Sequence, residues 1–255
     1  MTAPRKLRVA NAFDRANDYE RHADIQRIVA ERLASRIIAL DIDVTAPALE
    51  IGCGTGFLTK ALLDRWSSLR LTVNDVAPSM LDRTRSLIGE RNNVRYLLFD
   101  AERLTAAPAS FGLIVSSLAF QWFDHPAGTA NRLAHMLRPG GWLAFSTLDA
   151  GSFREWLDAQ RGAGLPGLTR DYPEADFFAE IKEPFQVGID RYTLRQSYPN
   201  GLEFLRSLKA IGAATPWSRG ASSGTRSLRK AIDLFERQGS TVTYEIAEIV
   251  IRREA

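Results

Sequence analysis

Glu50-Ile51-Gly52-Cys53-Gly54-Thr55-Gly56 is the stretch of sequence that decides the fold. It follows the short apolar run 46–51, which predicts a buried strand, and it precedes 57–66, which predicts a helix. Glycine tolerates positive φ and lets a ligand approach the backbone, and a sharp strand-to-helix turn needs both properties. The segment therefore predicts an α/β fold with a ligand site at this turn, and the alternative is a glycine turn that binds nothing.

The spacing of Gly52, Gly54 and Gly56 separates this loop from a dinucleotide-binding loop. That loop has the pattern Gly-x-Gly-x-x-Gly and presents a helix N-terminus to a pyrophosphate. Here the third glycine comes one residue early, and Glu50 precedes the first. A carboxylate at this position would repel a pyrophosphate, but it suits the ammonium group of S-adenosylmethionine. The loop therefore favours S-adenosylmethionine as the cofactor.

Two more acidic residues end the next two predicted strands. Asp75 is placed where a carboxylate can accept hydrogen bonds from both ribose hydroxyls, and Asp100 where one can accept a hydrogen bond from the adenine amino group. One such acid is often only a loop residue, but three in this order after a glycine loop argue against coincidence. Met80 either packs on the adenine or belongs to the core. The predicted cofactor residues are Glu50, Gly52, Gly54, Gly56, Asp75, Val76, Met80, Asp100, Ala101 and Glu102.

The rest of the chain alternates between predicted strands and helices, which is typical of a parallel sheet covered on both faces. Between 149 and 183 the pattern loosens and predicts loops and short helices. Strands are expected at 46–51, 69–74, 93–99, 111–118, 142–147, 185–197 and 241–252, and helices at 11–40, 57–66, 129–137, 202–209 and 228–237, with another beginning near Pro78.

Composition excludes several classes of protein. The 255 residues are 45% hydrophobic and 25% charged, with no apolar run near the roughly 18 residues that a membrane span needs. The first residues, 1–6, lack the apolar segment of a secretory signal. A single cysteine, Cys53, cannot form an internal disulfide. We therefore expect a cytoplasmic protein with no membrane contact.

Positive charge is concentrated in two segments. Residues 1–40 contain eight Lys and Arg against five Asp and Glu, and residues 191–237 contain nine against three. The net charge of the whole chain is only +3, which is too small to indicate nucleic acid. An asymmetry of this kind points to an acidic partner, and the alternative is a solvated helix surface.

From Pro47 to Leu148 the chain resembles the seven-stranded class of S-adenosylmethionine-dependent methyltransferases. The resemblance implies a Rossmann-like sheet with strand order 3-2-1-4-5-7-6 and an antiparallel last strand, together with an N-terminal helix and a small helical cap. A single domain, 1–255, is then expected to comprise a lid helix (1–40), a cofactor-binding core (46–148), substrate-side insertions and the cap (149–240), and the final strand (241–255).

Several acceptor chemistries of this class do not fit the sequence. Amino-group methylation typically uses a proline pair after the fourth strand, where this chain has 116–122 without one. Methylation of cytosine C5 needs a nucleophilic cysteine, and the histidines are too scattered to suggest a metal site. What remains is a nucleophile that needs little activation, such as a carboxylate, which is already ionised at pH 7. Alignment and exclusion of water would then suffice, without a dedicated base.

A narrower resemblance extends over nearly the whole chain, to the malonyl-acyl-carrier-protein O-methyltransferases of biotin synthesis. That family has an asparagine where this chain has Ser117, which places Ser117 at the methionine end of the cofactor. The motifs that carry the resemblance are Ala12–Ala16 with Tyr19, His22–Gln26, Gln121-Trp122, Phe145–Leu148, Leu208–Ala213 and Val242–Glu245.

The resemblance implies that the enzyme esterifies the free carboxylate of a malonyl thioester on an acidic acyl carrier protein or on CoA. The masked malonyl group then serves as a primer for the pimeloyl chain. Residues expected to position the substrate are Tyr19, His22, Gln26, Gln121 and Trp122, and residues expected to contact the carrier protein are Arg206, Lys209 and Arg229.

Three alternatives stay open from the sequence. Tyr19, His22 and Gln26 are spaced to share one helix face that closes over the site, but Tyr19 and Gln26 could instead only anchor the helix. The substrate could be a free di- or tricarboxylic acid. The protein could also bind the cofactor as an assembly or regulatory protein, without methyl transfer.

Overall fold

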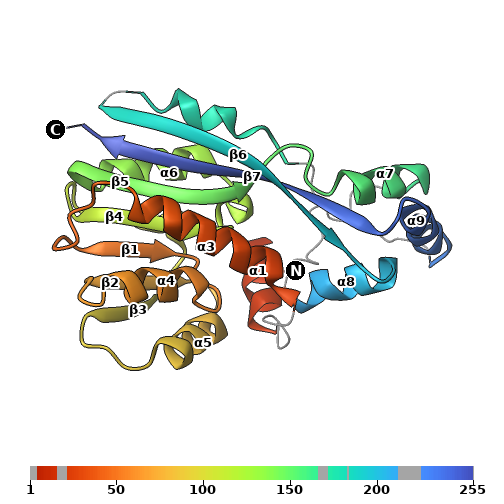
Figure 1. Ribbon diagram of the computed structural model, residues 1–255, viewed down its shortest axis with the longest axis horizontal. Coiled ribbons are helices and arrows are strands. Elements are labelled where there is room, and N and C mark those ends of the chain that lie inside the picture. The colour runs from red at the N-terminus through yellow and green to blue at the C-terminus, as the bar shows by residue number, and fades with distance from the viewer. Residues whose placement is uncertain (1–4, 16–21, 166–171, 183, 212–224, 255) are drawn as a thin grey trace. The chain divides into compact units, whose positions relative to one another are not determined.

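The computed structural model describes residues 5–15, 22–165, 172–182, 184–211 and 225–254, and its main element is a seven-stranded sheet (Figure 1). The strand order is β3-β2-β1-β4-β5-β7-β6, which confirms the order expected from the sequence. The strands are β1 (Ala48–Ile51), β2 (Leu71–Asp75), β3 (Val94–Leu98), β4 (Phe111–Ser117), β5 (Leu137–Leu148), β6 (Phe185–Ser197) and β7 (Thr241–Arg253).

Strand direction divides the sheet into a parallel part and an antiparallel part. β3, β2, β1, β4 and β5 pair in parallel. Where the chain leaves β5, the amide of Asp149 donates to the carbonyl of Glu245, and the amide of Phe153 donates to the carbonyl of Thr243. The residue number rises on one side and falls on the other, so β7 is antiparallel to its neighbour β5, as expected.

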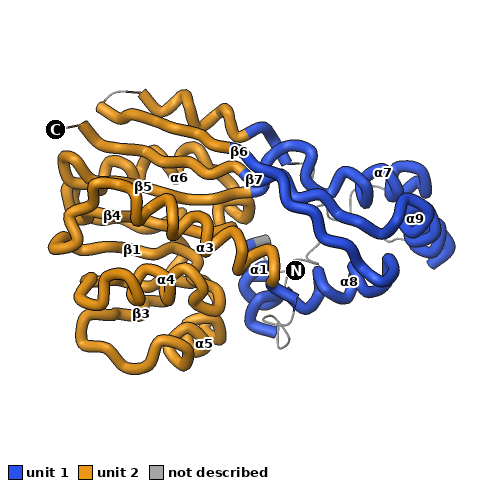
Figure 2. The backbone as a smooth tube through the Cα atoms, viewed as in Figure 1, with its two compact units in different colours: residues 1–23, 148–174, 191–246 blue, residues 24–147, 175–190, 247–255 orange. Residues whose placement is uncertain are grey.

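The chain forms two compact units, shown in different colours in Figure 2. Unit 1 comprises 1–23, 148–174 and 191–246, and unit 2 comprises 24–147, 175–190 and 247–255. Unit 2 contains the glycine loop and the parallel strands. Unit 1 contains 17 Lys and Arg against 12 Asp and Glu, whereas unit 2 contains 16 against 18. The basic excess therefore belongs entirely to unit 1.

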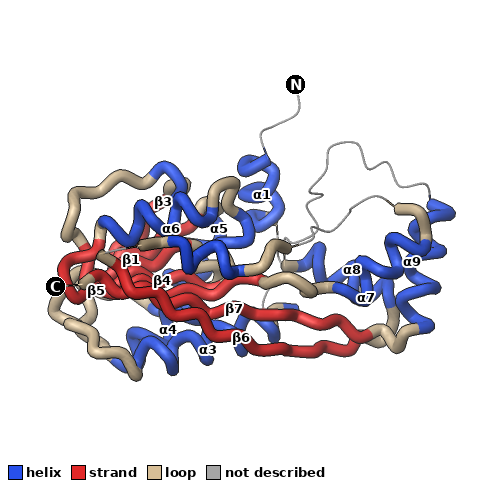
Figure 3. Tube along the Cα trace, turned by 90° about the horizontal axis from the view of Figure 1, so that it is seen from above, coloured by secondary structure: helices blue, strands red, loops and turns tan. Residues whose placement is uncertain are grey.

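Helices cover both faces of the sheet in unit 2, with α3 and α4 on one side of the strands and α6 on the other (Figure 3). Leu33 and Leu62 pack on the first face, and Leu133 and Phe178 pack on the second. The helices are α1 (Arg5–Asp14), α3 (Asp24–Ile38), α4 (Phe57–Arg65), α5 (Pro78–Ile88), α6 (Pro126–His135), α7 (Arg154–Gly162), α8 (Gly201–Ala210) and α9 (Thr225–Arg237), with short 3-10 helices η1 (Ala101–Arg103), η2 (Phe120–Trp122) and η3 (Ala175–Glu180).

The single helix expected over 11–40 is wrong. α1 ends at Asp14, and α3 begins at Asp24 after a non-helical Ala23. Within α3 the apolar residues recur every four residues from Ile25, and all are buried. Phe13 and Tyr19 precede Ile25 in the sequence at steps of six residues. Six residues turn about 240° around a helix, so positions at this spacing do not share one helix face.

β5 also differs from the prediction, because it begins at Leu137 rather than near 142. The predicted helix 129–137 and strand 142–147 leave Pro139-Gly140-Gly141 as a connection, but the strand passes through these residues with a register shift. Gly140 has φ +76°, and a Cβ on Gly141 would lie 2.9 Å from the carbonyl oxygen of Arg138. The glycines therefore allow a bulge in a continuous strand, which local turn signals do not reveal.

Gly112→Ala tests how closely β4 packs on the segment before β1. A Cβ on Gly112 would overlap the Cβ of Ala46, so we expect a loss of about 1–3 kcal/mol in the free energy of unfolding. Gly128→Ala is the matched control, because a Cβ in that turn of α6 meets nothing closer than 4.0 Å and alanine should stabilise the helix by roughly 0.5–1 kcal/mol. Urea unfolding measures both. A Gly112→Ala protein as stable as wild type would contradict the packing described.

Candidate functional site

The parallel strands bring the predicted acidic residues to one edge of the sheet. In the register, Glu50 of β1 pairs with Val73 of β2, and Asp75 of β2 pairs with Leu98 of β3. Asp100 follows two residues after β3 ends. The carboxyl ends of parallel strands form the ligand-binding edge in folds of this kind. Glu50, Asp75 and Asp100 thus stand at or just after the carboxyl ends of three adjacent strands.

The glycine loop needs glycine at each of its three positions. Gly52, Gly54 and Gly56 have φ values of +66°, +56° and +93°. A Cβ on Gly52 would lie 2.6 Å from the Cβ of Ala119, so the loop after β4 rests directly on this glycine. A Cβ on Gly56 would lie 3.0 Å from the Thr84 side chain, whose hydroxyl donates to the Gly54 carbonyl over 2.9 Å. Glycine therefore provides both the backbone conformation and the close contacts.

Asp75 joins the turns that follow β1 and β2. Its Oδ2 accepts a hydrogen bond from the Gly54 amide over 3.0 Å, and its Oδ1 accepts one from the Ala77 amide over 2.9 Å. The side chain is almost fully buried, and burial raises its pKa to about 6, although the amides of Ala77 and Gly54 oppose the shift. Each carboxylate oxygen has a second lone pair, so each can still accept a hydrogen bond from a hydroxyl group of a ligand.

Glu50 is the more deeply buried carboxyl, with a relative exposure of 1%. Its Oε2 accepts a hydrogen bond from the Thr59 hydroxyl over 2.6 Å. Burial raises its pKa to about 8, the Thr59 hydrogen bond opposes the shift, and the nearby charge of Asp75 adds to it. Within the described ranges, no Lys or Arg forms an ion pair with either carboxyl. A cationic ligand would supply the missing positive charge.

Among the buried polar atoms of unit 2 that lack a hydrogen-bond partner within the described residues are Thr55 Oγ1 in the glycine loop and Gln26 Oε1 in α3. Buried polar atoms in native structures are normally hydrogen-bonded, so such atoms are suited to a ligand. Thr55 lies in the same glycine loop as the Gly54 amide that Asp75 binds, and with the two carboxyls it fits a ligand that carries both a positive charge and hydroxyl groups, as S-adenosylmethionine does. Sequence reasoning missed Thr55, although it is the only hydroxyl side chain in the glycine loop.

Asp100 and Glu102 serve the turn after β3. Asp100 Oδ1 accepts a hydrogen bond from the Glu102 amide over 3.0 Å and so caps η1. The Glu102 carboxylate accepts hydrogen bonds from the amides of Asp124 and His125, over 2.9 Å and 2.8 Å. Glu102, which was predicted to bind the cofactor, therefore ties this turn to the segment before α6.

The other predicted cofactor residues differ in exposure. Val76 is 37% exposed, Met80 is 1% exposed and Ala101 is buried. The exposure of Met80 is that of a core residue, which was the alternative interpretation for it. Ser117, at the end of β4, lies 3.4 Å from the Ser146 hydroxyl, measured between the two oxygens.

The residues predicted to position the substrate are only partly brought together. Gln121 and Trp122 lie in η2, directly after β4, and Gln121 Nε2 donates to the Leu118 carbonyl over 2.6 Å. Gln26 lies in α3, but His22 precedes the start of that helix, so the helix face predicted for His22 and Gln26 is wrong. The chain is non-helical at the intervening residue. Tyr19 lies outside the described residues.

The predicted carrier-contact residues lie on α8 and α9 of unit 1. Arg206 and Lys209 are exposed on α8, and Arg229 is exposed on α9. Arg206 forms an ion pair with Glu203, one turn earlier in α8.

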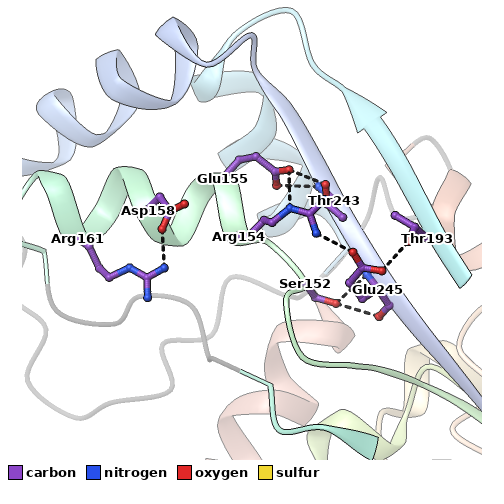
Figure 4. Close-up of polar contacts among 8 residues, drawn as sticks. All are labelled: Ser152, Arg154, Glu155, Asp158, Arg161, Thr193, Thr243 and Glu245. Atoms are coloured by element: carbon purple, nitrogen blue, oxygen red, sulfur yellow. Dashed lines mark hydrogen bonds and ion pairs between the residues drawn. The ribbon is translucent and has the colours of Figure 1, made fainter. Parts of the chain in front are cut away.

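The motif Val242–Glu245 has a structural role within unit 1 (Figure 4). The Thr243 amide and hydroxyl both donate to Glu155 of α7. The Glu245 carboxylate accepts from Arg154 over 2.7 Å and from the Thr193 hydroxyl over 2.6 Å. These contacts bind α7 and β6 to β7 and explain why a polar motif stands in this strand.

The described part of the chain contains no group of three His, Cys, Asp or Glu that could hold a metal ion. No helix in the same ranges is both long enough and apolar enough to cross a bilayer.

Comparison with known proteins defines the class. Residues 49–145 match the family described as "Methyltransferase domain". A putative methyltransferase from Bacillus halodurans shares the fold with a TM-score of 0.61 at 13% identity, over 88% of this chain and 99% of that one. The YcgJ protein from Bacillus subtilis gives 0.60 at 16% identity, over 88% and 98%. The chain is an S-adenosylmethionine-dependent methyltransferase of class I fold.

Curated relatives define the family. The malonyl-[acyl-carrier protein] O-methyltransferase of Magnetococcus marinus is 32% identical over 95% of this chain and 91% of that protein. Its counterpart in Paenibacillus is 35% identical over 82% of both chains. The biotin biosynthesis bifunctional protein BioCD of Bordetella avium is 43% identical over 94% of this chain, which spans only 51% of that longer protein. The chain belongs to the malonyl-[acyl-carrier protein] O-methyltransferase family.

Glu50→Gln tests the buried carboxyl. Burial raises the pKa of Glu50 from its ordinary value of 4.5 to about 8, so the folded protein binds more protons between these values. The stability that Glu50 contributes is therefore fully present below pH 4.5 and is lost as pH rises through 8. Without ligand, wild type should lose stability relative to Glu50→Gln by up to about 1.4 kcal/mol per pH unit in this window.

Urea unfolding between pH 5.5 and 8.5 measures this difference. Glu90→Gln, which removes a glutamate from an exposed turn, controls for the loss of one negative charge. A stability difference between wild type and Glu50→Gln that does not change with pH would show that Glu50 is not a buried titrating group.

Proposed function

We propose that this protein transfers the methyl group of S-adenosylmethionine to the free carboxylate of a malonyl group carried by an acyl carrier protein. The observation that carries the proposal is the similarity, over nearly the full length, to malonyl-[acyl-carrier protein] O-methyltransferases such as that of Magnetococcus marinus. Esterification masks the malonyl charge and lets the group act as a primer in biotin synthesis, as the family resemblance implies.

The carboxyl edge of the sheet supplies the cofactor contacts in this proposal. When bound, S-adenosylmethionine supplies an electrophilic methyl group on a sulfonium. Glu50 faces the ammonium group of the cofactor through the glycine loop. Asp75 accepts hydrogen bonds from the ribose hydroxyls with the lone pairs that its two backbone hydrogen bonds leave free. Asp100 accepts a hydrogen bond from the adenine amino group. Thr55 and Gln26 contribute the buried oxygens that have no partner among the described residues.

The acceptor needs alignment rather than activation. A malonyl carboxylate with an ordinary pKa is already ionised at pH 7 and is itself the nucleophile. The side chains of unit 2 then have two tasks, to hold the acceptor oxygen in line with the reacting methyl group and to exclude water. Ser117, Gln121 and Trp122 at the end of β4 are the residues we assign to these tasks.

The basic surface of unit 1 suits an acidic carrier protein. Arg206 and Lys209 are three residues apart on α8 and share a face of that helix. Arg226, Arg229 and Lys230 share a face of α9 in the same way, with Asp233 one turn later. Acyl carrier proteins are small and acidic, so this surface steers their approach.

The substrate assignment is tested with methyl-labelled S-adenosylmethionine and a panel of acceptors. We expect base-labile label on malonyl-carrier protein and weaker labelling of malonyl-CoA. Acetyl-carrier protein is the matched control and should stay unlabelled, because it lacks the free carboxylate. Label only on free di- or tricarboxylic acids would favour the small-acid alternative. No label on any acceptor, with cofactor binding intact, would favour an assembly or regulatory role.

Lys209→Glu tests the docking surface. Charge reversal on α8 should lower kcat/KM for malonyl-carrier protein roughly three- to tenfold at low salt, because it weakens steering. The loss should shrink between 0.1 M and 1 M salt, where the Debye length falls from about 10 Å to about 3 Å. Cofactor affinity should not change. Lys60→Glu makes the same charge change at an exposed position of α4 in unit 2 and should leave kcat/KM unaltered. Equal effects of the two charge reversals would mean that the basic surface faces solvent and does not steer the carrier protein.

A further inference from the structure

The segment after β4 begins with a strained residue. Leu118 has φ +49°, in the left-handed region that residues other than glycine rarely adopt. It stands where the sheet order switches, since β1 has β2 on one side and β4 on the other. Ligands bind in α/β sheets at such a switch point, and backbone strain persists there only when the surroundings hold it.

Two residues, Ser146 and Gln121, hold the backbone of Leu118. Its amide donates to the carbonyl oxygen and to the hydroxyl of Ser146, over 3.1 Å in each case. Its carbonyl accepts a hydrogen bond from Gln121 Nε2 over 2.6 Å. Ser146 is fully buried in β5 and pairs with Ser117 in the register. Ser146 therefore holds the turn at the amide of Leu118, and Gln121 holds it at the carbonyl of Leu118.

The conformation of Leu118 sets the position of the segment 118–122. The next residue, Ala119, packs directly on Gly52, because a Cβ added to Gly52 would lie 2.6 Å from the Cβ of Ala119. η2, with Gln121 and Trp122, follows immediately. Glu102 holds the far end of the segment, because its carboxylate accepts hydrogen bonds from the amides of Asp124 and His125. The segment is thus held at one end against Gly52 of the glycine loop and at the other by Glu102 of η1.

We propose that Ser146 is a positioning residue for methyl transfer. Its hydroxyl holds Leu118 in the left-handed conformation, and this turn places the acceptor side of the site against the glycine loop. Gln121 acts on the same turn from the carbonyl side, so it positions the substrate through the backbone. The kinetic part of this inference rests on the proposed function, whereas the structural part does not.

Ser146→Ala removes the hydroxyl and leaves the strand intact. We expect kcat to fall about tenfold or more, because small misplacements of an acceptor are costly. The Kd for S-adenosylhomocysteine should change less than about threefold, since the hydroxyl acts through the acceptor side. Ser207→Ala is the matched control, because Ser207 is also buried and donates a single hydrogen bond, to the Phe204 carbonyl within α8. It should lose comparable stability without loss of kcat.

A second variant separates strain from simple destabilisation. Glycine adopts positive φ without strain, so Leu118→Gly should make the Ser146 hydroxyl dispensable. Ser146→Ala should then lower kcat much less in the Leu118→Gly background than in wild type. Equal losses in both backgrounds, or a Ser146→Ala protein that loses only thermal stability, would overturn the proposal.

Hydrogen–deuterium exchange supplies a readout that does not depend on activity. Peptides covering 118–125 should lose protection in Ser146→Ala and keep it in Ser207→Ala. If wild type methylates none of the acceptors, the proposed function fails, and this exchange difference still decides whether the turn is held by Ser146. Unchanged protection of 118–125 would refute the positioning role whatever the substrate is.

Discussion

The burial of two carboxyl groups, Glu50 and Asp75, is the constraint on which the rest of the structure depends. Both stand at the carboxyl edge of a parallel sheet, and burial raises their pKa values to about 8 and about 6. Asp75 is tolerated there because backbone amides reach it, and the amide of Gly54 reaches it only because the loop adopts positive φ. The glycine spacing, the sharp turn and the buried acids are therefore parts of one arrangement. A cationic ligand completes it, because it supplies the charge that the carboxyls lack.

The polar contacts at this edge hold neighbouring strand ends together rather than only facing a ligand. The amide group of Asn74 donates to the carbonyls of Leu97 and Phe99, and the Ser116 hydroxyl donates to the Ile51 carbonyl. Glu102 and Ser146 do the same for the turn after β4. We infer that the site is rigid before the ligand arrives, which suits a reaction whose main requirement is alignment. Charge is arranged differently in unit 1, where Arg206, Lys209 and Arg229 lie exposed on α8 and α9.

Local sequence signals predicted most of the elements, and the family resemblance implied the strand order. The expected strand 185–197 coincides with β6, because its alternation of apolar and polar residues is visible along the chain. The failures arose where contacts distant in sequence decide the structure. The break at Ala23 and the strand through Pro139-Gly140-Gly141 have no local signature. The hydrogen bonds of Glu102 to the amides of 124 and 125 could not be predicted either, because nothing in the sequence links these positions. The contact of Ser146 with Leu118 was likewise invisible, since it joins two strands.

The most direct test of this account is the number of protons released when S-adenosylhomocysteine binds. Glu50 is mainly protonated at pH 7 in the ligand-free protein and should ionise against the ammonium group of the ligand. Calorimetry in two buffers of different ionisation enthalpy measures the release. The account predicts about one proton at pH 7, declining as pH rises above 8. Identical heats in the two buffers at pH 7, with normal affinity, would contradict it, because the buried carboxyl would then play no part in binding the cofactor.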